Sequence, residues 1–226
     1  MIILFLINSL TFYLGLRFDY CQISDFNEHF EYLNNRAHHL GWSGKFSRFH
    51  NLLYAPVIEL DYFTIENFST SFSLSWFWDK NNGEFIYTNS TEILRLNETW
   101  DYWTLPFDLK FKLNTGSFIF TSGFTISIAR LNINVNGNYE INEEYPMQFT
   151  SDDVGLFISL IKRFGRLAFE ISYNYMEIDQ FHNKRGYLYF DPDEKYIYLG
   201  PPHHRNPSAV LSHSGLGLRY QYLIFR

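Results

Sequence analysis

A strict two-residue alternation of apolar and polar side chains is the feature that most limits what this chain can fold into. Between residues 68 and 78, the even positions hold Phe, Leu, Trp and one Thr, whereas Ser occupies positions 69, 71, 73 and 75. A β-strand sends successive side chains to opposite faces, so such a segment has one apolar face and one small or polar face. The pattern recurs in seven more segments: 12–20, 54–62, 105–113, 118–128, 154–160, 167–175 and 216–224.

The composition and the strand lengths restrict the class of protein. Aromatic residues make up 20% of the 226 residues, which favours strands over helices. The predicted strands have about ten residues, a length that suits a tilted membrane-crossing strand of about 9–11 residues. Strands of soluble proteins are usually nearer about five or six residues. The net charge of −6 gives no basic surface, so we expect no nucleic-acid partner.

The links between the predicted strands alternate between short and long. Three are short (64–67, 114–116 and 162–165), and four are long (22–53, 79–103, 130–152 and 177–210). Short turns at one rim and long loops at the other are typical of bacterial outer-membrane barrels. We therefore predict an all-β fold: an eight-stranded antiparallel up-and-down transmembrane β-barrel with short periplasmic turns and long extracellular loops. A soluble eight-stranded barrel or a β-sandwich is the alternative.

The domain prediction follows from these strands. Residues 12–226 form a single outer-membrane barrel domain, and residues 1–11 are interpreted as a truncated signal or another N-terminal apolar segment. The stretch MIILFLI at the start is apolar, but no Lys or Arg precedes Arg17, so the positive region of a signal peptide is missing. In the first long link, the spacing of Phe26, Phe30 and Leu33 predicts a helix that lies over the barrel mouth.

Three strand motifs carry a resemblance to a known family. They are TLPFDLKF (104–111) followed by FIFTSG (118–123), then FEISYNY (169–175), and finally LGLRYQY (216–222). In this order they resemble the strands of the PorT-like outer-membrane β-barrel family. The resemblance implies an eight-stranded barrel in the outer membrane of Bacteroidetes-type bacteria. It implies no single activity, although some members are linked to protein secretion and gliding.

Charged residues on the polar face predict a lumen filled by ion pairs. Five of them are expected at similar heights and form the predicted network: Arg17, Glu59, Asp108, Glu170 and Arg219. Asp19, Asp61, Lys110 and Lys112 share the same inner face. An eight-stranded barrel is only just wide enough for side chains, so these charges must pair. An ion path through the lumen is the alternative.

Two further groups of residues are candidates for interfacial or binding roles. We predict that an aromatic girdle at the outer membrane interface contains four tryptophans: Trp76, Trp78, Trp100 and Trp103. A metal site is weakly indicated by histidines in the first and last long links: His38, His39, His203 and His204. His213 and Ser214 lie near the outer interface, but adjacent strand residues point to opposite faces, which is poor geometry for a nucleophile and its base.

The sequence therefore predicts a non-enzymatic outer-membrane protein that is structural or interacts through its extracellular loops, with no cofactor and no catalytic residues. The expected partners are outer-membrane lipid, the barrel assembly machinery, and an extracellular or secretion-system protein. The alternatives are a narrow channel and a lipid-modifying enzyme of the deacylase kind.

Overall fold

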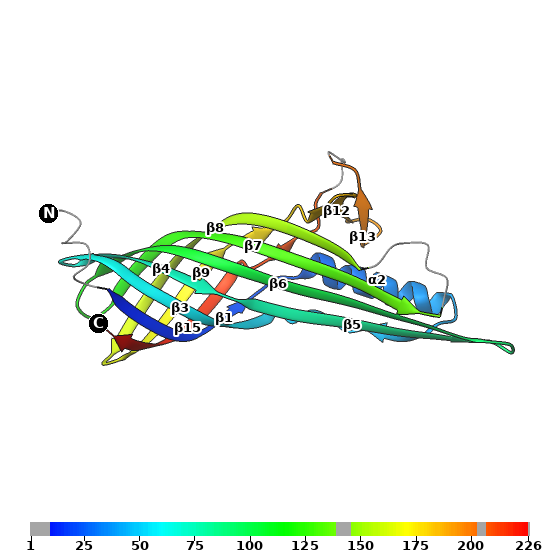
Figure 1. Cartoon of the computed structure of the whole chain (residues 1–226), viewed down its shortest axis with the longest axis horizontal. Helices are drawn as coiled ribbons and strands as arrows, with labels where there is room; N and C mark the ends of the chain where they lie inside the picture. The colour runs from blue at the N-terminus through cyan, green and yellow to red at the C-terminus, as the bar shows by residue number, and fades with distance from the viewer. Residues whose placement is uncertain (1–9, 139–145, 203–206, 226) are drawn as a thin grey trace.

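The alternating segments become the strands of a closed antiparallel barrel. The computed structural model describes residues 10–138, 146–202 and 207–225. The barrel has eight strands if β4 and β5 are taken as one, because they follow each other directly with Trp76 between them (Figure 1). The barrel strands are β1 (Thr11–Tyr20), β3 (Leu52–Ile65), β4 (Phe68–Ser75), β5 (Phe77–Thr88), β6 (Ile93–Asn114), β7 (Ile119–Gly137), β8 (Met147–Phe164), β9 (Leu167–Tyr175) and β15 (Gly215–Phe225).

The sheet closes because the last strand pairs with the first. β15 pairs with β1, where Arg17 lies opposite Arg219, and with β9, where Arg219 lies opposite Glu170. Every barrel strand therefore has a neighbour on each side, as a backbone surrounded by lipid requires. The start of β1 and the end of β15 lie at the end of the barrel that carries the short turns (Figure 1). Gly116 adopts a φ of +85° in the predicted turn at 114–116, a conformation that glycine tolerates well.

The opposite end of the barrel carries a folded cap. It contains the helix α2 (Ser24–His39), which the sequence predicted, and the hairpin β12–β13, which stands out from the barrel (Figure 1). β2 pairs with β5, and β11 pairs with both β8 and β12. The short strands of the cap are β2 (Ser43–Phe46), β10 (Glu177–Ile178), β11 (His182–Asn183), β12 (Gly186–Asp191), β13 (Tyr196–Gly200) and β14 (Leu211–Ser212).

The prediction of loops at 79–103 and 130–152 is wrong for most of these residues. β6 is 22 residues long and β7 is 19, so both strands continue far into the cap. The polarity of their faces inverts where they leave the barrel. On β7, the outward residues Phe124, Ile126 and Ile128 give way to Arg130 and three asparagines at 132, 134 and 136, while the inward side changes from small polar residues to Leu131 and Ile133.

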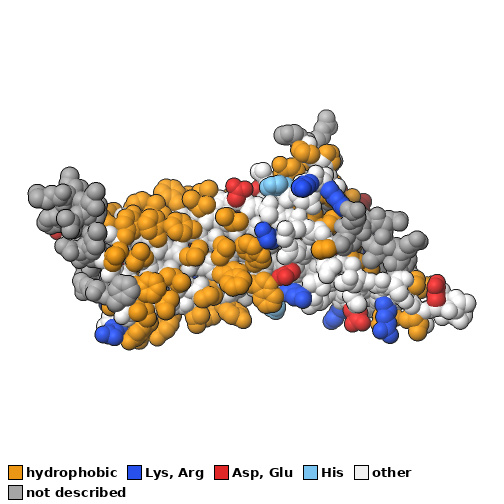
Figure 2. All heavy atoms as spheres, in the orientation of Figure 1, with side chains coloured by type: hydrophobic (Ala, Val, Ile, Leu, Met, Phe, Trp, Pro, Cys, Tyr) orange, Lys and Arg blue, Asp and Glu red, His pale blue; other side chains and the backbone are white. Residues whose placement is uncertain are grey.

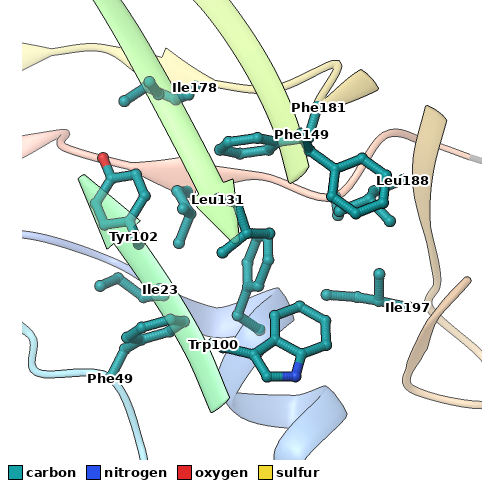
Figure 3. Packing of buried hydrophobic residues seen from close by; sticks show 14 of the residues in the cluster. Ile23, Phe49, Trp100, Tyr102, Leu131, Phe149, Ile178, Phe181, Leu188 and Ile197 are labelled. Carbon is teal, nitrogen blue, oxygen red and sulfur yellow. The ribbon is translucent and has the colours of Figure 1, made fainter. Parts of the chain in front are cut away.

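The inversion places a second core inside the cap. Apolar residues of β6, β7 and β8 face α2, the first long link and the last long link, and they form one cluster of buried side chains (Figure 3). Figure 2 shows the matching outer surface: apolar side chains cover most of the barrel and become sparse where the cap begins. Within the described residues, no helix has the length and the apolarity needed to cross a membrane.

Candidate functional site

Charged side chains fill the interior of the barrel and pair with one another. Apart from Arg163, they have at most 7% of the side chain exposed. The structure brings all five residues of the predicted network together with the other four inward charges, and it adds Arg163. The paired groups are the basic residues Arg17, Lys110, Lys112, Arg163 and Arg219, and the carboxylates Asp19, Glu59, Asp61, Asp108 and Glu170.

Asp108 is the centre of the group nearest the cap. Its carboxylate accepts hydrogen bonds from the guanidinium groups of Arg219 and Arg17, the latter at 3.2 Å. The hydroxyl groups of Ser73 and Thr125 donate to it as well, each at 2.8 Å. Asp108 on β6 therefore joins side chains of β1, β4, β7 and β15. These four donors compensate a carboxylate that has no exposed surface.

Glu59 is the centre of the group nearest the short turns. Lys110 Nζ lies 2.7 Å from Glu59 and 2.9 Å from Glu170, so it bridges two carboxylates. Lys112 also bonds to Glu59, and its Nζ lies 2.5 Å from Asp61. Each ammonium group is therefore shared between two carboxylates. This arrangement satisfies both buried lysines, whose side chains are at most 1% exposed.

Arg219 links the two groups, and Arg163 closes the lower end. Arg219 lies 3.9 Å from both Glu59 and Glu170, farther than from Asp108, although Glu170 is its neighbour in the strand register. Arg163 lies 3.5 Å from Asp61 at the wall of a 270 Å³ cavity at the short-turn end. Arg163 was not predicted to face the lumen, because it lies in a predicted short link.

A second polar cluster lies between the ion pairs and the cap core. The Tyr102 hydroxyl lies 2.6 Å from His213 Nε2, and Cys21 Sγ lies 3.3 Å from His213 Nδ1. All three residues are at most 1% exposed. The Ser214 hydroxyl bonds instead to the backbone of Met176. The partners of the His213 ring are therefore Tyr102 and Cys21 rather than the serine, and the Cys21 thiol is buried.

Helix α2 closes the upper end of the barrel with aromatic side chains. Phe26 and Phe30 are fully buried, and both rings make edge contacts with Trp100 (5.9 and 5.3 Å between centroids). His29 Nδ1 accepts a hydrogen bond of 2.9 Å from the backbone N–H of Ile197, which fixes the helix to β13. Burial lowers the pKa of His29 to about 4, so its imidazole is neutral at physiological pH.

The four predicted girdle tryptophans divide into two groups. Trp76 and Trp78 lie on the outer surface and are 56% and 55% exposed. Trp103 also faces outward, and the Arg130 guanidinium lies 5.2 Å from the centre of its ring. The prediction for Trp100 is wrong, because its side chain is 3% exposed and belongs to the cap core (Figure 3). Trp100 points inward because it shares the face of β6 that carries Tyr102.

The candidate metal residues are not brought together where the structure describes them. His38 and His39 are exposed near the end of α2, and His38 Nε2 lies 2.9 Å from the backbone oxygen of Gly44. His203 and His204 lie outside the described residues. Among residues 10–138, 146–202 and 207–225, no group of three or more His, Cys, Asp or Glu side chains is arranged to hold a metal ion.

Comparison with solved structures finds proteins of similar fold. The fold is similar to that of Ail, the attachment invasion locus protein of Yersinia pestis, which was crystallised in complex with the heparin analogue sucrose octasulfate. The TM-score is 0.42 and the identity is 8%, over 94% of this chain and 97% of Ail. No protein-family model matches the sequence, and no curated protein matches it.

Proposed function

We propose that this chain is a non-enzymatic protein of the bacterial outer membrane, in which a closed barrel anchors a rigid cap at the cell surface. The cap acts by contact with an extracellular or secretion-system protein. The observation that carries the proposal is the inversion of polarity along β6 and β7. The outer surface is apolar beside a polar lumen, and it becomes polar beside an apolar cap core.

The height of the apolar surface supports a membrane position. On β8, outward residues from Val154 to Phe164 are apolar except for Lys162 near the short turn. These ten steps cover about 33 Å of strand at about 3.3 Å each. With a tilt of about 40°, the segment spans about 25 Å, which is the usual height of the apolar band of outer-membrane barrels. The long-loop end then faces outward, by analogy with such barrels.

The lumen is blocked at two levels, which favours an anchor over a channel. The ion pairs around Asp108 and Glu59 occupy the barrel interior, and the buried core around Phe26 and Trp100 covers its upper end. Moving a buried ion away from its partners is costly, so these charges do not form a mobile ion path. The same packing argues against the deacylase alternative, since the ring of His213 is buried and has partners other than Ser214.

Family membership and partners belong to the same proposal. The motifs at 104–111, 169–175 and 216–222 are the support for a PorT-like barrel of Bacteroidetes-type bacteria. Outer-membrane lipid surrounds the barrel, and the barrel assembly machinery inserts it. The cap is folded around its own core, which makes it a fixed surface rather than a set of loose loops.

Conductance separates the anchor from the channel. Purified protein is inserted into planar lipid bilayers, and a general porin is inserted under the same conditions as the reconstitution control. We expect no unitary current steps from the protein while the porin gives regular steps. Reproducible steps of constant size from the protein would contradict the closed lumen and make the narrow channel the better account.

A further inference from the structure

A row of paired residues lies close to the position at which the polarity of the outer surface inverts on each strand. Trp78 on β5 lies opposite Trp103 on β6, and Trp103 lies opposite Arg130 on β7. The row continues through Thr150 on β8 to His182 on β11. Aromatic and basic side chains at this level are typical of the interface between lipid tails and headgroups. Features directly above the row are therefore at headgroup level.

An open pocket of about 790 Å³ lies above the β8–β11 end of this row. Lys184 and Arg185 form the turn between β11 and β12, and both side chains are exposed. Figure 2 shows Lys, Arg and His side chains gathered beyond the edge of the apolar surface. Six of the residues that line the pocket carry polar groups: Gln148, Thr150, His182, Asn183, Lys184 and Arg185.

The walls of the pocket are held in place by their own contacts. Asn183 Oδ1 accepts hydrogen bonds from the backbone N–H groups of Arg185 and Gly186, at 2.8 and 3.3 Å, which fixes the turn. The ring of His182 stacks on that of Tyr187, with 5.3 Å between centroids. The pocket therefore presents basic and amide groups from a defined turn rather than from a free loop.

We propose that this pocket binds the phosphorylated sugar headgroup of an outer-leaflet glycolipid. Lys184 and Arg185 supply the positive charge and the N–H donors that phosphate oxygens accept. Gln148 and Thr150 supply amide and hydroxyl groups for sugar hydroxyls. The position selects a lipid over a soluble ligand, because the outward residues of β8 below the pocket, Val154 onward, form the apolar surface along which acyl chains lie.

Acidic side chains beside the pocket oppose the phosphate, and removing the most exposed of them should change binding in the opposite direction from removing the basic charges. Asp152 is exposed on the outward face of β8, two residues from Thr150 and toward the apolar surface. Its carboxylate repels a phosphate in the pocket. Removal of this charge should therefore strengthen binding, whereas removal of the basic charges of the turn should weaken it.

The test is a lipid titration of the full-length protein in detergent, followed by native mass spectrometry. The probes are purified lipid A and the same lipid after enzymatic removal of its phosphates. For Lys184→Gln combined with Arg185→Gln, we expect the apparent Kd for lipid A to rise about thirtyfold, from an effect of about five- to sixfold per basic side chain. Asp152→Asn should lower that Kd. Lys45→Gln, an exposed change in β2 outside the pocket, serves as the matched control and should leave it unchanged.

The proposal requires that the double variant and the parent bind dephosphorylated lipid equally, and that the variant still shows the gel shift of a folded barrel. Equal binding of lipid A by the parent and the folded double variant would overturn it. Competition by inorganic phosphate at concentrations similar to that of the lipid would also overturn it, since the pocket would then recognise free phosphate. The inference rests on the proposed membrane position, but these outcomes leave the conductance result unaffected, so the two failures are distinguishable.

Discussion

The pair formed by Arg219 and Asp108 gives the most quantitative prediction about the barrel interior. Both side chains are at most 1% exposed, and their guanidinium and carboxylate groups are hydrogen-bonded. Removing one partner of a buried ion pair typically costs about 3–5 kcal/mol, because the remaining charge is left without compensation. We expect a loss of this size in the free energy of unfolding for Arg219→Met and for Asp108→Asn.

The double variants identify the partner. Arg219→Met combined with Asp108→Asn should cost less than the sum of the single changes, with a coupling energy of about 1–3 kcal/mol. Arg219→Met combined with Glu170→Gln should show a smaller coupling, because Arg219 is 3.9 Å from Glu170, and Glu170 keeps its bond with Lys110 at 2.9 Å. Unequal coupling would show that the contact across the lumen outweighs adjacency in the strand register.

The assay is equilibrium unfolding by guanidinium chloride of barrels folded in lipid vesicles, followed by tryptophan fluorescence and by the gel shift between folded and unfolded forms. Identical slopes of the transitions for parent and variants make the free energies comparable. Single variants that stay within about 0.5 kcal/mol of the parent, as surface changes usually do, would refute the reasoning. The lumen would then be wet, and its charges would be solvated.

Two further predictions concern the interface and the cap. Brominated lipids with the bromine near the headgroups should quench Trp76, Trp78 and Trp103 more strongly than Trp100, measured on variants that keep one tryptophan; strong quenching of Trp100 would place it in lipid. The pKa of His29 falls from 6.5 to about 4 on burial. Between these two pH values His29 is therefore protonated in the unfolded protein and neutral in the folded cap. The free energy of unfolding is therefore unaffected by His29 above pH 6.5, and it decreases by about 3 kcal/mol as the pH falls toward 4. The protection factors of the α2 amides, which correct for the intrinsic pH dependence of hydrogen exchange, should fall over this range in the parent but not in His29→Gln; an equal fall in both would exclude His29 as the cause.

The barrel could be predicted from sequence because its alternation has a constant sense. From 105 to 113 and from 118 to 128, apolar residues face outward and small or polar residues face inward without a change of phase, apart from Pro106, Ile119 and Ser122. The parity also places the lumen charges, since a strand leaves only two directions for a side chain. The nine predicted inward charges could therefore be located before their distances were known.

The cap could not be predicted in the same way, because the sense of the alternation reverses. Beyond Trp103 and Arg130 the strands continue, but the apolar residues change to the inward face, so a search for an outward apolar series stops there. Trp100 was assigned to the outer surface for this reason. The pairing of Arg219 with Asp108 could not be predicted from the sequence either, because it depends on which strands face each other across the lumen.

The orientation of the cap is the central claim, and cysteine labelling in intact cells tests it most directly. In a Cys21→Ser background, Asn89→Cys places a thiol at the β5–β6 turn of the cap, and Thr115→Cys places one in a short turn of the barrel. A membrane-impermeant maleimide should label the Asn89→Cys protein in intact cells, and the Thr115→Cys protein only after the outer membrane is permeabilised. Labelling of the Thr115→Cys protein alone in intact cells would contradict the account.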